Sequence, residues 1–181
     1  MSTWHLVTLA LMAILAFWMV GAYNRLVALR NAISAAWQQV DEVLARRGEA
    51  VAPLVAALRD GLEGEGASLD ALLSGQAQVA AAADGLRGLP VRAESAHAVV
   101  RAESAMASAS ARVLALLDLH PDLRETPAAA APAATLREAE PRLVFARQVF
   151  NEAVQAYNEA VRQWPTRALA RVYGFGTAGR L

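Results

Sequence analysis

An unbroken apolar run near the N-terminus constrains this chain more than any other feature. Residues 6–23 read LVTLALMAILAFWMVGAY, where only Thr8 interrupts the run, and no Asp, Glu, Lys or Arg precedes Arg25. A helix of about 20 apolar residues spans the hydrocarbon core of a bilayer. Trp4 and Tyr23 bracket the run, as interfacial aromatic residues do. The sequence therefore predicts a transmembrane anchor over residues 1–23.

The distribution of Arg residues predicts the direction of this anchor. Residues 1–5 contain no Arg or Lys, whereas Arg25, Arg30, Arg46 and Arg47 follow the run. By the positive-inside rule the N-terminus lies outside and the rest of the chain lies in the cytoplasm. A cleaved signal peptide ending near Val20-Gly21-Ala22 is an alternative, but the run is long and lacks a basic n-region. A buried core helix is a weaker alternative, because the run has no polar face.

Composition and motifs exclude several classes of function. All 17 basic residues are Arg, they balance 17 acidic residues, and no long basic stripe predicts a nucleic-acid partner. The absence of Cys excludes disulfides, thiol catalysis and cysteine metal sites. The three His residues are dispersed, and no nucleotide-binding, metalloprotease or hydrolase motif occurs. We expect a protein without catalytic residues, metal or cofactor.

Beyond the anchor, apolar residues three and four apart predict four amphipathic helices in residues 24–164. The first continues the anchor as one rod, with a stripe through Leu26, Ile33, Ala36 and Val40. Gly48 and Pro53 are expected to interrupt and kink it before it continues to about residue 62. The fold class expected is all-α, an N-terminal transmembrane helix continuous with an antiparallel four-helix bundle.

The later helices show similar patterns. The second lies near residues 69–86, and the third and fourth have heptad stripes. These stripes consist of Val99, Met106 and Val113 in the third helix, and of Leu143, Phe150, Tyr157 and Trp164 in the fourth. The Pro/Ala stretch 126–135 is predicted to be a mobile linker. Residues 165–181 form a basic, aromatic tail.

One face of the first helix is a candidate surface for a partner or for a second copy. Its polar residues repeat every seven positions, and an aromatic residue interrupts the adjacent row. A solvated face explains the polar residues but explains Trp37 poorly. The predicted face consists of Tyr23, Asn24, Arg30, Asn31, Trp37 and Gln38.

Polar residues flank the apolar stripe of the last helix. These are Glu140, Arg147, Asn151 and Asn158. We expect one or two of them to form hydrogen bonds within the bundle and fix its register, although a wetted flank explains Asn151 and Asn158 equally well. The alternative function is a ligand-binding protein or enzyme with a polar site built on these four residues.

The tail is a candidate membrane-surface segment. Four helical passes return the chain to the bilayer, and no acidic residue follows Glu159. Basic and aromatic residues suit the interface with anionic lipid. The candidates are Trp164, Arg167, Arg171, Tyr173, Phe175 and Arg180. Alternatively, Tyr173 and Phe175 simply cap the bundle.

Three blocks of residues resemble the LemA family of bacterial membrane proteins. The first runs from Tyr23-Asn24-Arg25-Leu26-Val27 to Trp37, Asp41, Arg46 and Arg47. The second is residues 119–124, LHPDLR. The third comprises Glu140, Arg147, Phe150-Asn151-Glu152-Ala153-Val154, Tyr157-Asn158, Trp164-Pro165 and Gly174-Phe175. The blocks cover almost the whole chain in order, and the third is the most specific.

The resemblance implies a membrane-tethered helical bundle in the bacterial inner membrane, with no established catalytic residues. It suggests a scaffold or adaptor in membrane organisation or quality control, either as a homo-oligomer or with a membrane-protein partner. The chain departs from the family pattern at Ala52-Pro53, where Pro-Asn is usual, and at Gly75-Gln76, where Ala-Arg is usual. Its Pro/Ala stretch also replaces a more polar segment, so local geometry differs at these places.

Overall fold

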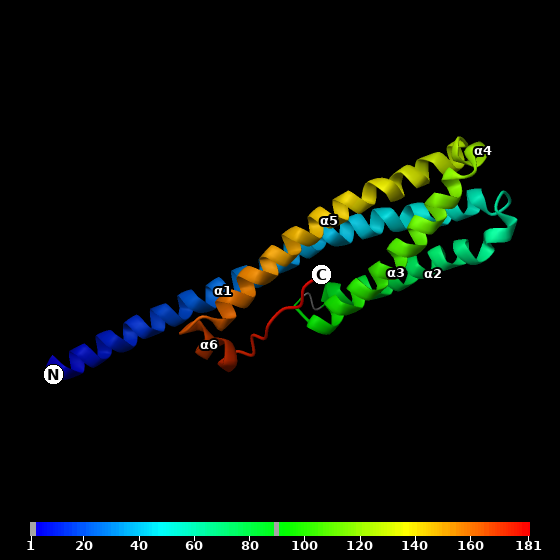
Figure 1. The fold of residues 1–181 in the computed structure, drawn as a ribbon. Coiled ribbons are helices and arrows are strands. Elements are labelled where there is room, and N and C mark those ends of the chain that lie inside the picture. The colour runs from blue at the N-terminus through cyan, green and yellow to red at the C-terminus, as the bar shows by residue number, and fades with distance from the viewer. Residues whose placement is uncertain (1–2, 89–90) are drawn as a thin grey trace.

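The protein is all-α in a computed structural model that describes residues 3–88 and 91–181. Four long helices run alternately away from the N-terminus and back towards it (Figure 1). The elements are α1 (Thr3–Leu58), the 3-10 turn η1 (Glu63–Glu65), α2 (Gly66–Gly88), α3 (Ala93–Asp118), α4 (Pro121–Arg124), α5 (Pro127–Arg162) and α6 (Thr166–Val172). The predicted fold class, with its apolar N-terminal helix, is confirmed.

Helix α1 joins the apolar run to the bundle without a break. Its N-terminal part projects beyond the other helices (Figure 1). An 18-residue window there has a mean hydropathy of 2.1 and no buried residue, so this helix is long and apolar enough to cross a membrane. From Leu26 onwards α1 enters the core, where Ile33, Ala36 and Val40 are buried as predicted.

Gly48 and Pro53 do not interrupt α1, so that prediction was wrong. The helix continues through both and ends at Leu58. Pro53 removes one backbone donor, but Val51, Leu54, Val55 and Leu58 are buried and stabilise the helical conformation. At Gly48 the space that a Cβ would occupy holds the side chain of Gln76 from α2.

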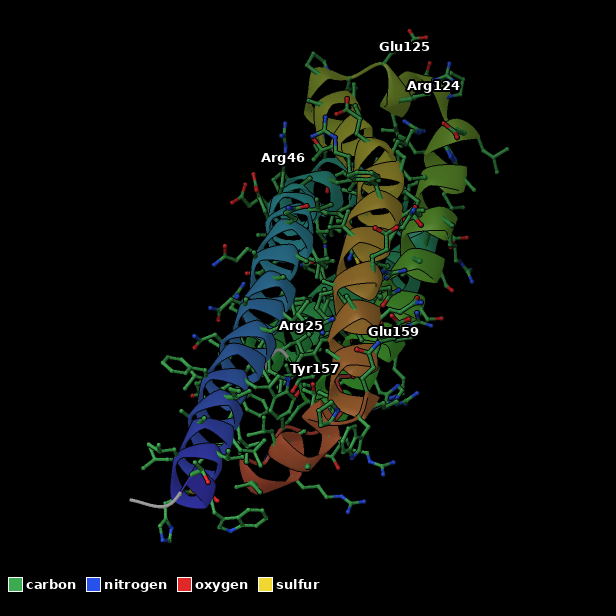
Figure 2. The ribbon with its side chains drawn as sticks, turned by 90° about the vertical axis from the view of Figure 1, so that its left-hand side faces the viewer. Arg25, Arg46, Arg124, Glu125, Tyr157 and Glu159 are labelled. Carbon is green, nitrogen blue, oxygen red and sulfur yellow. The ribbon has the colours of Figure 1, made fainter. Side chains whose placement is uncertain are left out.

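The helices pack as two close antiparallel pairs. Helix α5 lies along α1, and α3 lies along α2, while α2 also contacts α1 (Figure 1). Figure 2 shows side chains filling the space between α1 and α5, with Arg124 and Glu125 at the end opposite the N-terminus. Within the described residues α3 and α5 make no comparable backbone contact, so what joins them has to be side chains or another segment.

The heptad stripes of α3 and α5 form the core beside α1. Val99, Met106 and Val113 are buried, as are Leu143, Phe150 and Tyr157. Trp164 departs from its predicted place in the stripe, because α5 ends at Arg162 and the indole is 80% exposed.

The stretch 126–135 is helical, so the prediction of a mobile linker was wrong. Pro127 occupies the first turn of α5, where its missing N–H removes no intrahelical bond. Ala is the strongest helix former. Ala129, Ala133 and Leu136 are buried, and this packing offsets the bond lost at Pro132 inside the helix.

Candidate functional site

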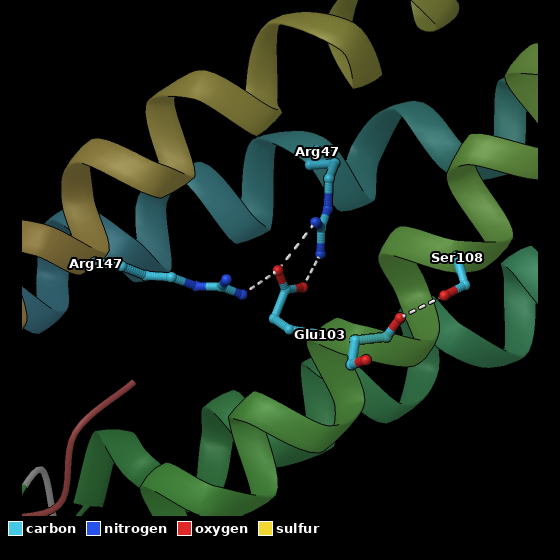
Figure 3. Close-up of polar contacts among 5 residues, drawn as sticks. Arg47, Glu103, Ser108 and Arg147 are labelled. Atoms are coloured by element: carbon cyan, nitrogen blue, oxygen red, sulfur yellow. Dashed lines mark hydrogen bonds and ion pairs between the residues drawn. The ribbon is translucent and has the colours of Figure 1, made fainter.

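A buried ion cluster connects three helices at the centre of the bundle. Arg47 from α1 and Arg147 from α5 both donate hydrogen bonds to the carboxylate of Glu103 on α3 (Figure 3). Arg47 binds both carboxylate oxygens, with its Nη1 lying 3.2 Å from Oε2, and Nη2 of Arg147 lies 2.8 Å from the same Oε2. Such a two-pronged pair is among the stronger hydrogen-bond arrangements.

The burial of its side chains determines how strongly this cluster affects the stability of the bundle. The side chains of Arg47 and Glu103 are each 3% exposed, whereas that of Arg147 is 30% exposed and reaches solvent. Nε of Arg47 has no hydrogen-bond partner among the described residues. A buried charge of this kind is tolerated only while it is paired. Glu103 thus joins α3 to α5 across the gap between their backbones.

The four polar residues predicted on the last helix, Glu140, Arg147, Asn151 and Asn158, do not act together. Arg147 belongs to the ion cluster, and Asn151 and Asn158 bind the tail. Glu140 is exposed, so it is not part of the buried register. The four side chains do not form one site: Arg147 and Asn151 line one open recess, Asn158 lines another, and Glu140 lines neither.

Sequence reasoning missed Arg47 and Glu103. A spacing signal for both was present: Arg47 lies three residues after buried Leu44, and Glu103 lies between buried Val99 and Met106. A charged residue at a core position of a helical stripe is seldom fully buried unless paired. The pair itself could not be identified, because its members lie 56 residues apart.

Asn151 and Asn158 hold the end of the chain through paired hydrogen bonds to its backbone. Asn158 Oδ1 accepts from the Ala178 N–H at 2.7 Å, and its Nδ2 donates to the Ala178 carbonyl at 3.0 Å. Asn151 does the same with Leu181, at 2.9 and 2.7 Å. Seven helical residues advance about 10.5 Å and three extended residues about 10 Å. The two asparagines therefore match backbone sites three residues apart on an extended segment, and we call them the asparagine clamp.

The segment held by the asparagine clamp, residues 178–181, lies between α5 and the start of α3. Gly179 is buried, and a Cβ there would lie 2.5 Å from Cα of Ala93 at the start of α3. The tail reaches this position because it reverses direction at Gly174, whose φ of +70° is readily adopted only by glycine. Figure 1 shows the strand returning from α6 towards the bundle.

An aromatic cluster joins the tail to α1. The ring of Tyr23 lies 5.3 Å from that of Tyr173 and 5.9 Å from that of Phe175, between centroids. Phe175 is half-buried, and Arg180 is exposed and donates to Gln155. Trp164, Arg167, Arg171 and Tyr173 are exposed. The predicted tail therefore divides into residues 175–181, which cap the bundle, and residues 164–173, whose predicted membrane-surface side chains are exposed.

Trp37, the central aromatic residue of the predicted partner face on α1, does not lie on the surface. Trp37 is only 3% exposed, and its ring meets that of Phe150 edge-on at 6.2 Å between centroids. That interpretation of Trp37 was wrong: it belongs to a second core stripe, which α1 needs because it packs against both α5 and α2. The other five members remain exposed and are Tyr23, Asn24, Arg30, Asn31 and Gln38.

A groove between α1 and α5 is lined by both apolar and charged side chains. It has a volume of about 490 Å³. Its apolar residues are Val43, Ala139, Pro141, Phe145 and Ala146, and its charged rim consists of Glu42, Arg46, Glu138 and Arg142. Phe145 is 65% exposed. A large aromatic side chain left in water beside an apolar recess is typical of a contact surface.

The described part of the chain brings no three His, Cys, Asp or Glu side chains together in a metal-binding group. Burial raises the pKa of Tyr157, and the positive charge of Arg30 partly opposes this rise. Tyr157 therefore remains protonated in the core at neutral pH. The ion cluster and the asparagine clamp are suited to packing and to holding a backbone segment.

Comparison with known families agrees with the blocks identified in the sequence. The model of the LemA family matches residues 36–180, which is most of the chain. The matched region includes the ion cluster, the asparagine clamp and the groove. A search among curated proteins finds no match.

Proposed function

The chain belongs to the LemA family, and from this premise we propose that it is a membrane-anchored, non-enzymatic scaffold of the bacterial inner membrane. Its bundle holds a second copy or a protein partner at the cytoplasmic face, in membrane organisation or quality control. The observation that carries the proposal is the continuity of α1, whose first part exposes apolar side chains on every face and whose second part lies in the bundle core.

A continuous helix makes the anchor mechanically part of the bundle. No flexible linker separates residues 6–23 from Leu26 and Ile33, both fully buried. The bundle is therefore held at a fixed distance from the end of the span. A rigid support of this kind suits a scaffold, whereas a tethered enzyme needs only proximity to the membrane.

The orientation gives the first testable expectation. Because Arg25 and Arg30 follow the span and no basic residue precedes it, the C-terminus is expected in the cytoplasm. Alkaline phosphatase fused after Leu181 should be inactive, and green fluorescent protein fused there should be fluorescent. A variant with Arg30 and Arg25 changed to Gln and two Arg residues added before Trp4 serves as the control, since it should shift the population towards the opposite orientation. Phosphatase activity in the unaltered chain would contradict the assignment.

Self-association is the form of scaffolding that the groove favours. Copies inserted in the same direction can form a closed dimer only about an axis along the bilayer normal. Equivalent residues of two copies then lie at equal heights. Phe145 lies at the height of its own groove, so it also lies at the height of the groove of a second copy.

The charges of the rim support the same arrangement. Glu42 and Glu138 alternate with Arg46 and Arg142, so the rim carries equal numbers of acidic and basic residues. A second copy presents the same four residues. Each acidic residue of one copy can therefore pair with a basic residue of the other. Arg142 already pairs with Glu138 within the chain at 3.3 Å. The surface is thus self-complementary in charge and in the apolar residue that it exposes.

Crosslinking within the membrane tests this form of the proposal. The chain lacks Cys, so Gln39→Cys places a single thiol beside the groove. A short bismaleimide should convert most of this variant to a covalent dimer. Ser104→Cys, equally exposed but on α3, is the matched control and should remain monomeric.

A second substitution identifies the contact. Phe145→Asp in the Gln39→Cys background should reduce the dimer at least tenfold, because a carboxylate would be buried in an apolar recess. A band of unequal composition would instead identify an unlike protein partner. Monomer alone for Gln39→Cys would reject self-association at this surface.

A further inference from the structure

The outward part of the tail lies at the depth where the apolar run ends. Tyr23 is the last residue of that run, and the rings of Tyr173 and Phe175 are in contact with its ring. Interfacial tyrosines lie at the level of the lipid headgroups. Since centroid distances of 5.3 and 5.9 Å join these rings, the C-terminal end of α6 is fixed at the same level as Tyr23.

Helix α6 is buried on one side and flanked by exposed apolar residues. Thr166, Leu169 and Ala170 are buried against the bundle. Trp164 before the helix and Val172 at its end are each 80% exposed, and Tyr173 just after it is 53% exposed. Only the first set is needed for packing. The second set leaves apolar side chains in solvent, and one of them, Tyr173, contacts Tyr23 at the end of the apolar run of α1.

The charge around this surface has one sign. Arg162, Arg167 and Arg171 are exposed beside it, and the chain contains no acidic residue after Glu159. None of these three arginines takes part in an ion pair among the described residues. Elsewhere other exposed arginines, such as Arg137 and Arg142, do have acidic partners. Unpaired arginines around an apolar patch match a surface of anionic lipid headgroups.

The asparagine clamp holds α6 in this position. Residues 178–181 are bound to α5, and Tyr173 and Phe175 are packed on α1. The chain is therefore attached to the bundle both before and after the turn at Gly174, and these contacts fix the C-terminal end of α6. Capping the bundle and facing the membrane are therefore not alternatives for this tail. The cap formed by residues 175–181 orients residues 164–173.

We propose that residues 164–173 form a second membrane contact, a platform that rests on an anionic bilayer surface beside the end of the α1 span. Trp164, Val172 and Tyr173 enter the headgroup region, and Arg167 and Arg171 bind lipid phosphates. The platform rests on the proposed α1 anchor, because it needs a bilayer at the level of Tyr23. It prevents the bundle from tilting about its single span.

Three single-cysteine variants of the full chain test the platform and the anchor separately. A spin label is attached to Met12→Cys in the span, to Val172→Cys on the platform, or to Leu119→Cys near α4, where the side chain is 75% exposed. Each protein is reconstituted in vesicles that contain phosphatidylglycerol. Collisions of the label with oxygen, which concentrates in lipid, are compared with collisions with a water-soluble nickel chelate.

The proposed depth of each label in the bilayer predicts its relative accessibility to oxygen and to nickel. The label at residue 12 should be several-fold more accessible to oxygen than to nickel, and the label at residue 119 should show the reverse. The label at residue 172 should lie between them, with nickel accessibility reduced at least threefold relative to residue 119. If residue 172 matches residue 119 while residue 12 lies in lipid, the platform is overturned and the anchor stands. If residue 12 is also aqueous, both are overturned.

The lipid charge is tested in the same background. Arg167→Gln with Arg171→Gln should raise the nickel accessibility of the label at residue 172 in anionic vesicles. Arg124→Gln, at the far end of the bundle (Figure 2), is the matched control and should have no effect. Equal accessibility of residue 172 in neutral and anionic vesicles, at low salt, would overturn the assignment of anionic lipid as the ligand.

Discussion

Glu103→Ala is expected to destabilise the bundle by about 3–5 kcal/mol, the cost of breaking a buried ion pair. The substitution leaves the guanidinium of Arg47, whose side chain is 3% exposed, without its carboxylate. No other acidic side chain is bonded to Arg47 in the described structure. Urea unfolding of the full chain in detergent micelles, followed by circular dichroism, would measure the change in unfolding free energy from the shift in midpoint.

The matched control is an acidic residue in an exposed pair. Glu138→Ala removes a partner of Arg142, and both side chains are more than half exposed. Exposed pairs contribute at most about 1 kcal/mol, so this variant should unfold almost like the original protein. Equal effects at Glu103 and Glu138 would mean that water reaches the ion cluster.

The stability cost of substitution should also depend on burial for the two arginines, because Arg47 is buried and Arg147 reaches solvent. Arg147→Ala leaves Glu103 paired with Arg47, and we expect a loss of only about 1–2 kcal/mol. Arg47→Met combined with Glu103→Leu removes both deeply buried charges and leaves Arg147 free to reach solvent. This double variant should be more stable than Glu103→Ala, because apolar replacement of a whole buried pair is often neutral.

The parts of the fold that the sequence predicted are those encoded by local periodicity. Val99, Met106 and Val113 repeat every seven residues, and a helix places such residues on one face whatever lies opposite. The apolar run was equally plain, since it is apolar on every side of a helix. These features need no knowledge of the partner helix.

The parts that the sequence did not predict depend on which segments meet. Trp37 was assigned to the surface because Ala36 completes a regular stripe beside it, and only the position of α5 shows that the core extends to both. The Pro residues of 126–135 suggested a linker, yet the burial of Ala129 and Ala133 outweighs their local effect. Local propensity is readily overridden by tertiary packing of this kind.

The candidate site shows the same division. Asn151 and Asn158 flank the apolar stripe, so hydrogen bonding within the bundle and a wetted flank explained them equally well from the sequence. Their partner could not be predicted, because residues 176–181 have no periodic pattern and reach the bundle only after the reversal at Gly174. Arg47 and Glu103 show the converse, since each occupies a core position but only the fold shows that they form a pair.

Phe150→Ala is expected to destabilise the bundle by about 3–5 kcal/mol, the usual cost of deleting a buried aromatic ring. Phe150 is 0% exposed and lies where α5 crosses the Trp37 ring of α1. The ring contact adds about 0.5–1.5 kcal/mol beyond the apolar area that is lost. Tyr157→Ala, two turns further along the same stripe at 1% exposure, should have a similar effect.

Phe145→Ala is the control that separates burial from residue type. It deletes the same ring from the same helix, but Phe145 is 65% exposed. Its free energy of unfolding should change by less than about 0.5 kcal/mol, as for surface substitutions in general. The α1–α5 pair is the most extensive helix contact in the chain, so loss of Phe150 should also loosen the connection between the anchor and the bundle. A loss at Phe145 as large as that at Phe150 would mean that the groove, rather than the stripe through Phe150, is the packed side of α5.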